Sequence, residues 1–130
     1  MLFRFLLWIL SWRINSLSKK NEGFKKVIGD YQVVLQFKTE DLKVKRYFAF
    51  DAGQTHSKGK VHDNPTMAFV FKNPKSAMDL IKKMGENPND KTLFLMGIKD
   101  GEIKIEGDMA YMTWFQAMSN YFGPEEKAGS

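Results

Sequence analysis

Few residues in this chain have side chains suited to catalysis or metal binding. Its two histidines, His56 and His62, lie in one polar stretch, and the sequence contains no cysteine. Neither histidine has a second ligand at the helical spacing typical of metal sites. Ser57 and Asp51 lie near His56, but no nucleophile motif surrounds them. We therefore expect no metal, no catalytic residue and no cofactor.

Apolar side chains, by contrast, gather in a pattern that suits binding. Residues 109–122 contain no charged residue, and Asp108 before them can cap a helix. At about 100° per residue their polar side chains fall on one narrow stripe, so the remaining surface is aromatic and rich in methionine. Such a face is either an ordinary buried core face or the wall of a cavity for a flexible apolar ligand. Our candidates for the lining of that cavity are Leu80, Met84, Phe94, Tyr111, Phe115 and Met118.

Length and charge limit the architecture and the partners. A chain of 130 residues suits one domain with a single core. The net charge of +5 is uneven, because residues 1–60 carry +7 and residues 61–130 carry −2. A basic half suits nucleic acid or anionic lipid. Basic and aromatic residues alternate in residues 43–48, but any amphipathic strand shows this alternation, so we expect no nucleic-acid partner.

Residues 1–14 are the most hydrophobic part of the sequence. They are too short to span a membrane, which takes about 20 apolar residues. As a helix they would be apolar around most of the circumference, with Arg4, Ser11 and Asn15 on one thin polar edge. Four alternatives stay open: a helix at a membrane surface that the fold does not need, a core or lid helix, a dimerisation helix and a signal peptide. The expected membrane contacts are Phe3, Phe5, Trp8, Trp12, Lys19 and Lys20.

The middle of the sequence has the period of strands. Alternating apolar residues predict a hairpin over residues 31–50, followed by a polar edge strand within residues 52–65. The nearly continuous apolar run of residues 66–72 predicts a central strand. A further strand over residues 103–107 should end at Gly107 in a backbone conformation that disfavours a side chain.

Two helices are predicted between these last two strands. The Asn-Pro pair at residues 73–74 should begin the first helix, and Gly85 should end it. Residues 91–99 are compatible with a strand or a helix, and the proline and aspartate before them favour a helix. Residues 123–130 should form a flexible polar tail.

Taken together, four features of the sequence resemble the sterol carrier protein two family of small lipid carriers, over about residues 24–122. The most specific feature is the Lys-Ile-Glu-Gly-Asp-Met sequence that leads into the methionine-rich helix. In chain order, the four features are the paired strands of residues 31–50, the Asp-Asn-Pro-Thr sequence of residues 63–66, the helix end at Met84 and Gly85 followed by Asn87 and Pro88, and the sequence of residues 104–109.

The resemblance implies an α+β fold, with a five-stranded mixed β-sheet, helices covering one face and an apolar ligand tunnel between sheet and helices. It implies non-enzymatic carriage of a long apolar ligand such as a fatty acyl chain, phospholipid, sterol or isoprenoid or quinone lipid. Residues 16–122 would form the lipid-binding domain, and residues 1–15 an additional hydrophobic helix, as in similar bacterial accessory proteins that hold quinone precursors.

The resemblance also bears on location and on alternative functions. A stand-alone protein of this kind would be cytoplasmic, or peripheral on the inner face of a membrane. The alternatives are an interaction module that docks a partner protein or a second copy of itself, and an accessory subunit that presents a lipid-like substrate to an enzyme complex.

Overall fold

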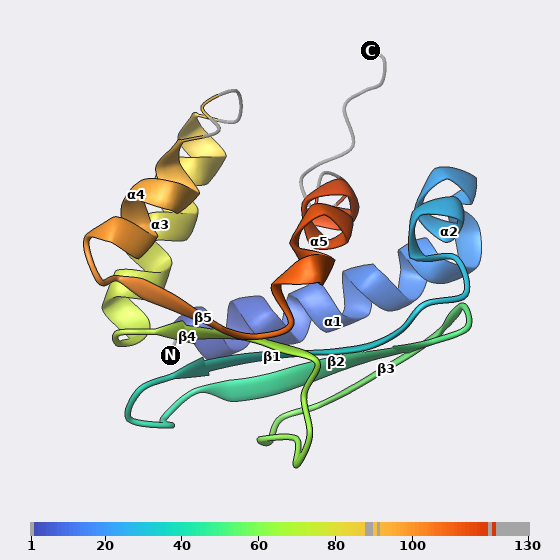
Figure 1. Cartoon of the computed structure of the whole chain (residues 1–130), viewed down its shortest axis with the longest axis horizontal. Coiled ribbons are helices and arrows are strands. Elements are labelled where there is room, and N and C mark those ends of the chain that lie inside the picture. Colours follow the sequence, from blue (N-terminus) through green and yellow to red (C-terminus); the bar gives the residue numbers. More distant parts are fainter. Residues whose placement is uncertain (1, 88–89, 91, 120, 122–130) are drawn as a thin grey trace.

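The computed structural model describes residues 2–87, 90, 92–119 and 121. The helices lie on one side of a single sheet (Figure 1), so the expected α+β architecture with a covered face is confirmed. In chain order the elements are α1 (Leu2–Lys20), α2 (Glu22–Ile28), β1 (Gln32–Thr39), β2 (Lys45–Asp51), β3 (Gln54–Lys58), β4 (Met67–Phe71), α3 (Pro74–Glu86), α4 (Leu93–Lys99), β5 (Ile103–Gly107), the 3₁₀ turn η1 (Met109–Tyr111) and α5 (Met112–Ser119).

The sheet is mixed, with strand order β3-β2-β1-β4-β5. β1 and β4 run parallel, and the other neighbouring strands run antiparallel. The predicted polar edge strand is β3, and the predicted central strand is β4, whose five residues are all buried. Parallel pairing of β1 with β4 sets Phe37 beside Phe69, and both side chains point toward the helices.

The opposite face of the sheet is partly covered by the loop between β3 and β4 (Figure 1). The buried amide of Gln36 on β1 holds this loop. Its nitrogen donates to the carbonyl of Lys60 at 3.2 Å, and its oxygen accepts from the backbone N–H of His62 at 2.7 Å. The His62 ring also packs on Tyr47, with centroids 4.8 Å apart. These contacts satisfy a buried polar side chain that would otherwise destabilise the fold.

Helix α1 corrects two expectations about the N-terminal segment. It continues to Lys20, so the expected boundary between residues 15 and 16 falls inside one helix. One face of the helix belongs to the domain core and includes Phe3, which is 1% exposed and lies 5.2 Å from the ring of Phe71. Phe3 is therefore a core residue and not a membrane contact. Among the described helices, none is long and apolar enough to cross a membrane.

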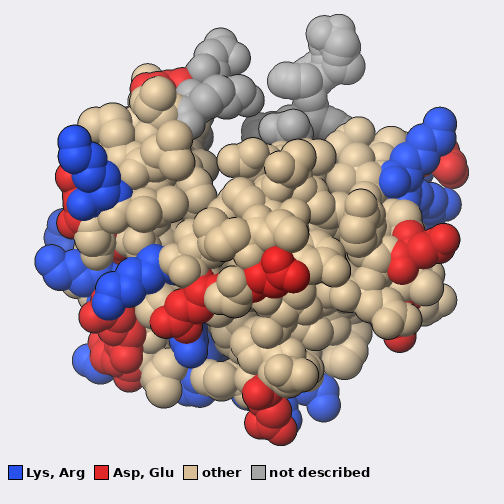
Figure 2. Space-filling model, in the orientation of Figure 1, with Lys and Arg blue, Asp and Glu red and all other residues tan. Residues whose placement is uncertain are grey.

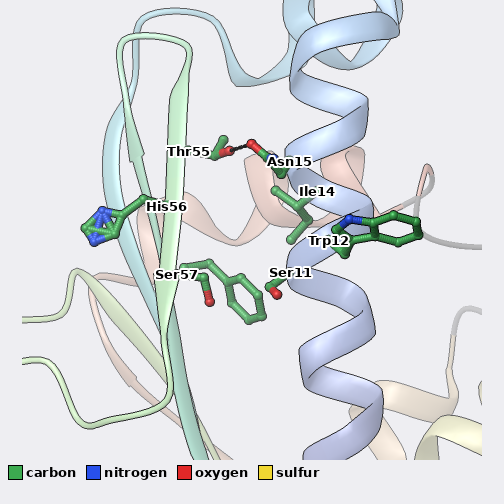
Figure 3. Close-up of a pocket in the computed structure, with 8 residues that line it drawn as sticks. Ser11, Trp12, Ile14, Asn15, Thr55, His56 and Ser57 are labelled. Carbon is green, nitrogen blue, oxygen red and sulfur yellow. Dashed lines mark hydrogen bonds between the residues drawn. The ribbon is translucent and has the colours of Figure 1, made fainter.

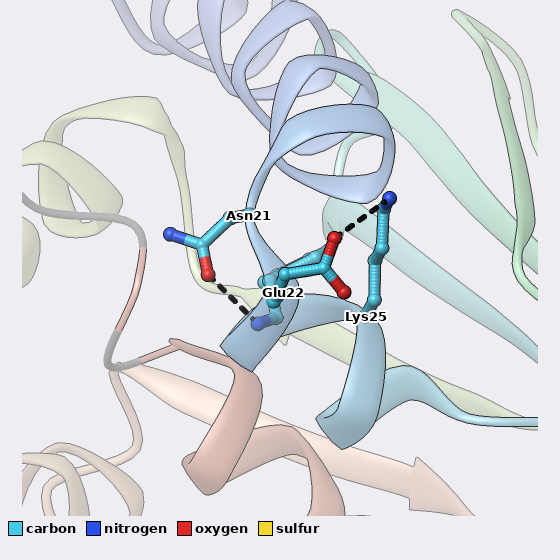
Figure 4. Close-up of polar contacts among 4 residues, drawn as sticks. Asn21, Glu22 and Lys25 are labelled. Atoms are coloured by element: carbon cyan, nitrogen blue, oxygen red, sulfur yellow. Dashed lines mark hydrogen bonds and ion pairs between the residues drawn. The ribbon is translucent and has the colours of Figure 1, made fainter.

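The junction between α1 and α2 is fixed by a local cap (Figure 4). The side-chain oxygen of Asn21 accepts a hydrogen bond from the backbone N–H of Phe24 at 3.0 Å. Glu22 and Lys25 form an ion pair at 3.4 Å one turn apart. Capping by asparagine stabilises a helix by about 1 kcal/mol, which allows a short helix such as α2 to begin directly after α1.

The last helix begins with a tighter turn than predicted. Asp108 caps it as expected, since its carboxylate accepts from the N–H of Ala110 at 2.9 Å, but the first turn is 3₁₀ and α5 ends at Ser119. The predicted end at Phe122 lies outside the described residues, as does the tail 123–130. Residues 91–99, which were compatible with either type, contain the helix α4, as favoured.

Gly107 has the predicted backbone conformation. Two factors oppose a side chain there, its positive φ and the close approach of Thr66, and Gly101 shares only the first. The φ of Gly107 is +94°, and a Cβ there would lie 2.4 Å from the carbonyl oxygen of Thr66. Gly101 also has positive φ, +78°, but has open space around it. Gly107→Ala should therefore cost about 2–4 kcal/mol of unfolding free energy, and Gly101→Ala only about 1 kcal/mol. Urea unfolding measures both, and equal costs would show that the approach of Thr66 is unimportant.

Two phenylalanines of α1 test whether the helix belongs to the core. Phe3 is buried, whereas Phe5 is 55% exposed and stacks on Trp8. We expect Phe3→Ala to lower the unfolding free energy by about 3–5 kcal/mol and Phe5→Ala to change it by less than about 0.5 kcal/mol. Denaturant titrations followed by far-ultraviolet circular dichroism give both values. If Phe3→Ala is as mild as Phe5→Ala, α1 is a detachable segment.

Candidate ligand-binding site

The helices that cover the sheet meet above one aromatic side chain. α3 packs on α4 and α1, whereas α5 packs on α2. Phe69 on β4 lies under both groups, because its ring centroid is 6.2 Å from that of Phe94 on α4 and 4.6 Å from that of Phe115 on α5. Figure 1 shows the α3–α4 hairpin and α5 standing apart above the strands, and Figure 2 shows the surface hollowed between them. We call the four side chains Phe37, Phe69, Phe94 and Phe115 the Phe69 seam.

The floor of the Phe69 seam is closed and its walls are partly open. Phe37 stacks on Phe69 with centroids 4.9 Å apart, and both strand residues are buried. Phe94 and Phe115 remain half-buried, although each contacts the buried floor. No member of the seam carries a charge or a hydrogen-bonding side chain. The site therefore suits an apolar group that covers the two half-buried rings.

Of the six predicted lining residues, the structure brings Phe94 and Phe115 together at the seam. Leu80 is buried inside the α3–α4 hairpin, where Gly97 lets the helices approach; a Cβ on Gly97 would lie 3.1 Å from Leu80 Cδ2. Met84, at 39% exposure, lies on the surface of α3.

The other two predicted residues lie on or next to α5. Tyr111 packs on Tyr31 and Trp114, with ring centroids 6.1 Å and 6.5 Å away. Met118 is completely buried, which a packed core and the wall of a closed cavity would both produce. Two pockets that can be measured among the described residues are lined by none of the six. The continuous tunnel between sheet and helices stays a prediction.

Sequence reasoning missed the floor of the seam. Phe37 and Phe69 lie on strands, whereas every predicted lining residue was placed on the covering segments. Both residues were assigned to apolar strand faces, but their proximity follows from the parallel register of β1 and β4. Periodicity gives the face of a strand and not its neighbour, so no signal in the sequence pairs them.

Part of the polar edge predicted for residues 1–14 lies beside the edge strand β3. Ser11 and Asn15 line a pocket of about 280 Å³ between α1 and β3, opposite Thr55 and Ser57 (Figure 3). Asn15 and Thr55 approach to 3.5 Å, whereas Trp12 points away from β3. This edge of α1 is therefore used for packing beside the sheet, and the exposed aromatic residues lie next to it.

The residues first considered for catalysis do not form a site. His56 and Ser57 are neighbours on β3, but His56 points away from α1 and Ser57 lies on the side of α1 (Figure 3). In the part of the chain that the structure describes, no three His, Asp or Glu residues are grouped to hold a metal ion. Hydrogen bonds from Thr39 and Thr92 lower the pKa of Asp41 and Asp90 respectively, and both contacts stabilise turns.

Comparison with solved structures identifies the architecture. The UbiJ-SCP2 ubiquinone synthesis protein matches with a TM-score of 0.60 and 16% identity, over 86% of this chain and 88% of that one. A crystal structure of sterol carrier protein 2 matches with a TM-score of 0.59 and 13% identity, over 94% and 95% of the two chains. This chain has the sterol carrier protein 2 fold. No family model and no curated protein matches its sequence.

The sterol carrier protein 2 fold also occurs inside a larger enzyme. A variant of the sec-alkyl sulfatase PisA1 matches with a TM-score of 0.53 and 18% identity, over 72% of this chain but only 14% of that one. The fold therefore makes up most of some solved chains and a small part of another. At these identities the likeness concerns the fold, and the function has to be argued from the site.

Proposed function

We propose that this chain binds and carries a long apolar ligand in the Phe69 seam. The observation that supports the proposal is the pair of half-buried rings, Phe94 and Phe115, above the closed floor of Phe69. Two aromatic walls that belong to different helices leave apolar surface accessible at the centre of the helical layer. An apolar chain lying between them would remove that surface from water, at about 25 cal/mol per Å².

The elements around the seam expose further apolar side chains. Three of these are methionines, which are between 39% and 53% exposed. Methionine is unbranched and polarizable, so it adapts to ligands of variable shape. A loose preference among fatty acyl chains, phospholipids, sterols and isoprenoid or quinone lipids would follow. The three residues are Met84 on α3, Met96 on α4 and Met109 on η1.

Carriage is the form of action that the seam supports. Its four phenylalanines offer no acid, base or nucleophile, so a bound lipid would be held and not transformed. The UbiJ-SCP2 ubiquinone synthesis protein has the same fold, which makes an isoprenoid lipid one candidate for the ligand. Native mass spectrometry of freshly purified protein, with extraction of what co-purifies, identifies the ligand directly.

The alternative is an interaction module or an accessory subunit of an enzyme complex. The exposed Leu95 and Met96 of α4 would then be covered by a partner protein. A carrier purifies with lipid or gains thermal stability when lipid is added, because the ligand binds only the folded state. An interaction module purifies empty, and only its partner raises its melting temperature.

Two neighbouring residues of α4 test the seam. Phe94 contacts Phe69, whereas Leu95 is 63% exposed. Phe94→Ser should raise the Kd for a fluorescent fatty-acid analogue about tenfold, because the ligand loses an aromatic wall worth more than about 1 kcal/mol. Leu95→Ser should change the Kd less than about twofold. Fluorescence titration of both folded variants measures this, and equal effects of the two would remove Phe94 from the binding site.

We also propose that the protein is cytoplasmic and that the exposed side of α1 docks on the inner face of an anionic membrane. The buried face anchors α1 in the core, while Phe5, Trp8 and Trp12 are 55%, 56% and 74% exposed. Aromatic side chains partition into the membrane interface, and Lys19 and Lys20 at the end of α1 add attraction to anionic lipid. A second copy of the chain could cover the same stripe, which would make a homodimer.

Substituting the two tryptophans separates docking from dimerisation. Trp8→Ser with Trp12→Ser should reduce flotation with phosphatidylglycerol vesicles at least about fivefold, because two exposed aromatic anchors are lost. Leu95→Ser with Met96→Ser removes exposed apolar surface from α4 and should leave flotation unchanged. Sedimentation gives the oligomeric state of each variant. If the tryptophan variant turns a dimer into a monomer without changing flotation, α1 is a dimerisation helix.

A further inference from the structure

A groove with a different lining from the aromatic Phe69 seam is formed mainly by basic residues. It lies between the first turns of α1 and the start of β2 and has a volume of about 310 Å³. Four of its seven lining residues are basic and none is acidic. The lining residues are Arg4, Leu7, Lys43, Val44, Lys45, Arg46 and Gly59.

Arg46 is the most constrained of these cations. It pairs with Phe37 across the sheet, on the side of the helices, and its guanidinium donates to the hydroxyl of Ser57 at 2.9 Å. The same group lies beside Gly59, where a Cβ would be in van der Waals contact with Arg46 Nη2 at 3.4 Å. Burial lowers the pKa of Arg46, and among the described residues no carboxylate pairs with it. A partly desolvated guanidinium without a counter-ion favours an external anion.

The acidic residues of the adjoining turn are engaged elsewhere. Glu40 pairs with Lys104 at 3.6 Å. Asp41 accepts hydrogen bonds from the Thr39 hydroxyl at 2.6 Å and from the backbone N–H of Lys43 at 3.0 Å, so its charge offsets part of the Lys43 charge while it holds the turn. The balance of charge in the groove remains strongly positive.

The other two cations join the walls of the groove. The Arg4 guanidinium donates to the backbone carbonyl of Lys43, which ties α1 to the turn before β2. Lys45 Nζ donates to the carbonyl of Leu42 at 3.1 Å. Neither bond neutralises a charge, because a carbonyl is an uncharged acceptor. The groove is therefore lined by basic residues of α1, the turn and β2, two of which bridge its walls through backbone carbonyls.

We propose that this groove binds a phosphate group, carried by the headgroup of an anionic phospholipid or by a free phosphate. A phosphate has the charge and the oxygen geometry that several cations and an arginine fork recognise together. Its position favours the lipid source, because Phe5 and Trp8, next to Arg4 and one turn after it on α1, are exposed and suited to the membrane interface. The groove shares no residue with the Phe69 seam, so the site does not depend on an apolar ligand there; its lipid arm deepens the proposed docking of α1.

The test compares two double variants of equal charge. Lys43→Gln with Arg46→Gln removes two cations of the groove, and Lys82→Gln with Lys83→Gln removes two exposed lysines of α3. Each is examined by amide chemical shifts during titration with inorganic phosphate, and by flotation with vesicles of phosphatidic acid in phosphatidylcholine. We expect saturable shifts at residues 43–46 and 59 in the unaltered protein, and binding at least about tenfold weaker in the groove variant but less than about twofold weaker in the α3 variant.

The two arms distinguish the source of the phosphate. Loss of vesicle binding alone assigns a lipid headgroup, loss of the phosphate shifts alone assigns a soluble phosphate, and either result supports the site. The proposed site is overturned if the groove variant and the α3 variant lose binding equally, or if neither loses binding. It is also overturned if the protein binds a single-stranded oligonucleotide more tightly than vesicles. If the groove variant is unfolded by circular dichroism, Arg46→Lys replaces it; that variant keeps the charge without the fork and should weaken binding about threefold.

Phe94→Ser separates this site from the proposed carrier function. It should leave both the phosphate shifts and the flotation unchanged while it weakens the binding of the apolar ligand. An effect of Phe94→Ser on the phosphate shifts would contradict the separation of the two sites.

Discussion

The structure depends on covering one apolar face of the sheet. The parallel register of β1 and β4 and the antiparallel register of β1 and β2 bring large aromatic side chains together on this face. Helices from both ends of the sequence are needed to bury it, because α1 reaches β4 through Phe3 and Phe71, and α5 reaches it through Phe115 and Phe69. The five aromatic residues of the face are Phe37, Phe48, Phe50, Phe69 and Phe71. The helical layer, and with it the Phe69 seam, is a consequence of this one requirement.

The same requirement explains why α1 has three different sides. A helix that is apolar around its circumference is normally buried all round, but a helix lying on a sheet can bury only one face. The core takes the face of Phe3 and Leu7, and the polar edge packs beside β3. What remains is the aromatic stripe of Phe5, Trp8 and Trp12, which no described element covers. The alternatives of core helix and membrane helix, which the sequence left open, are therefore compatible with one another.

Local patterns predicted elements well and long-range placement poorly. Gly107, the cap at Asp108 and the polar edge strand depend on neighbouring residues, so the sequence contained enough to predict them. The burial of Phe3 and the meeting of Phe37 with Phe69 depend on which segments become neighbours, and helical or strand periodicity does not specify that. For the same reason only Phe94 and Phe115 of the six predicted lining residues meet at the seam, while Met84 lies on the surface.

The two walls of the Phe69 seam are not equally anchored, and this bears on how a ligand would enter. Trp114 ties α5 to α2, since its indole N–H donates to the carbonyl of Val27 at 3.1 Å and its ring packs on Phe50. Helix α4 has seven residues, and Thr92 at its start makes no side-chain capping bond. Among the residues of the two helices whose burial is described, α4 buries only Gly97, whereas α5 buries Trp114 and Met118, so α4 has fewer buried side chains to hold it against α3 and β5. Elements with few buried contacts open first. Entry on the side of α4 would leave α5, the sheet and the exposed aromatic side of α1 in place, so ligand exchange would be compatible with the proposed docking of α1.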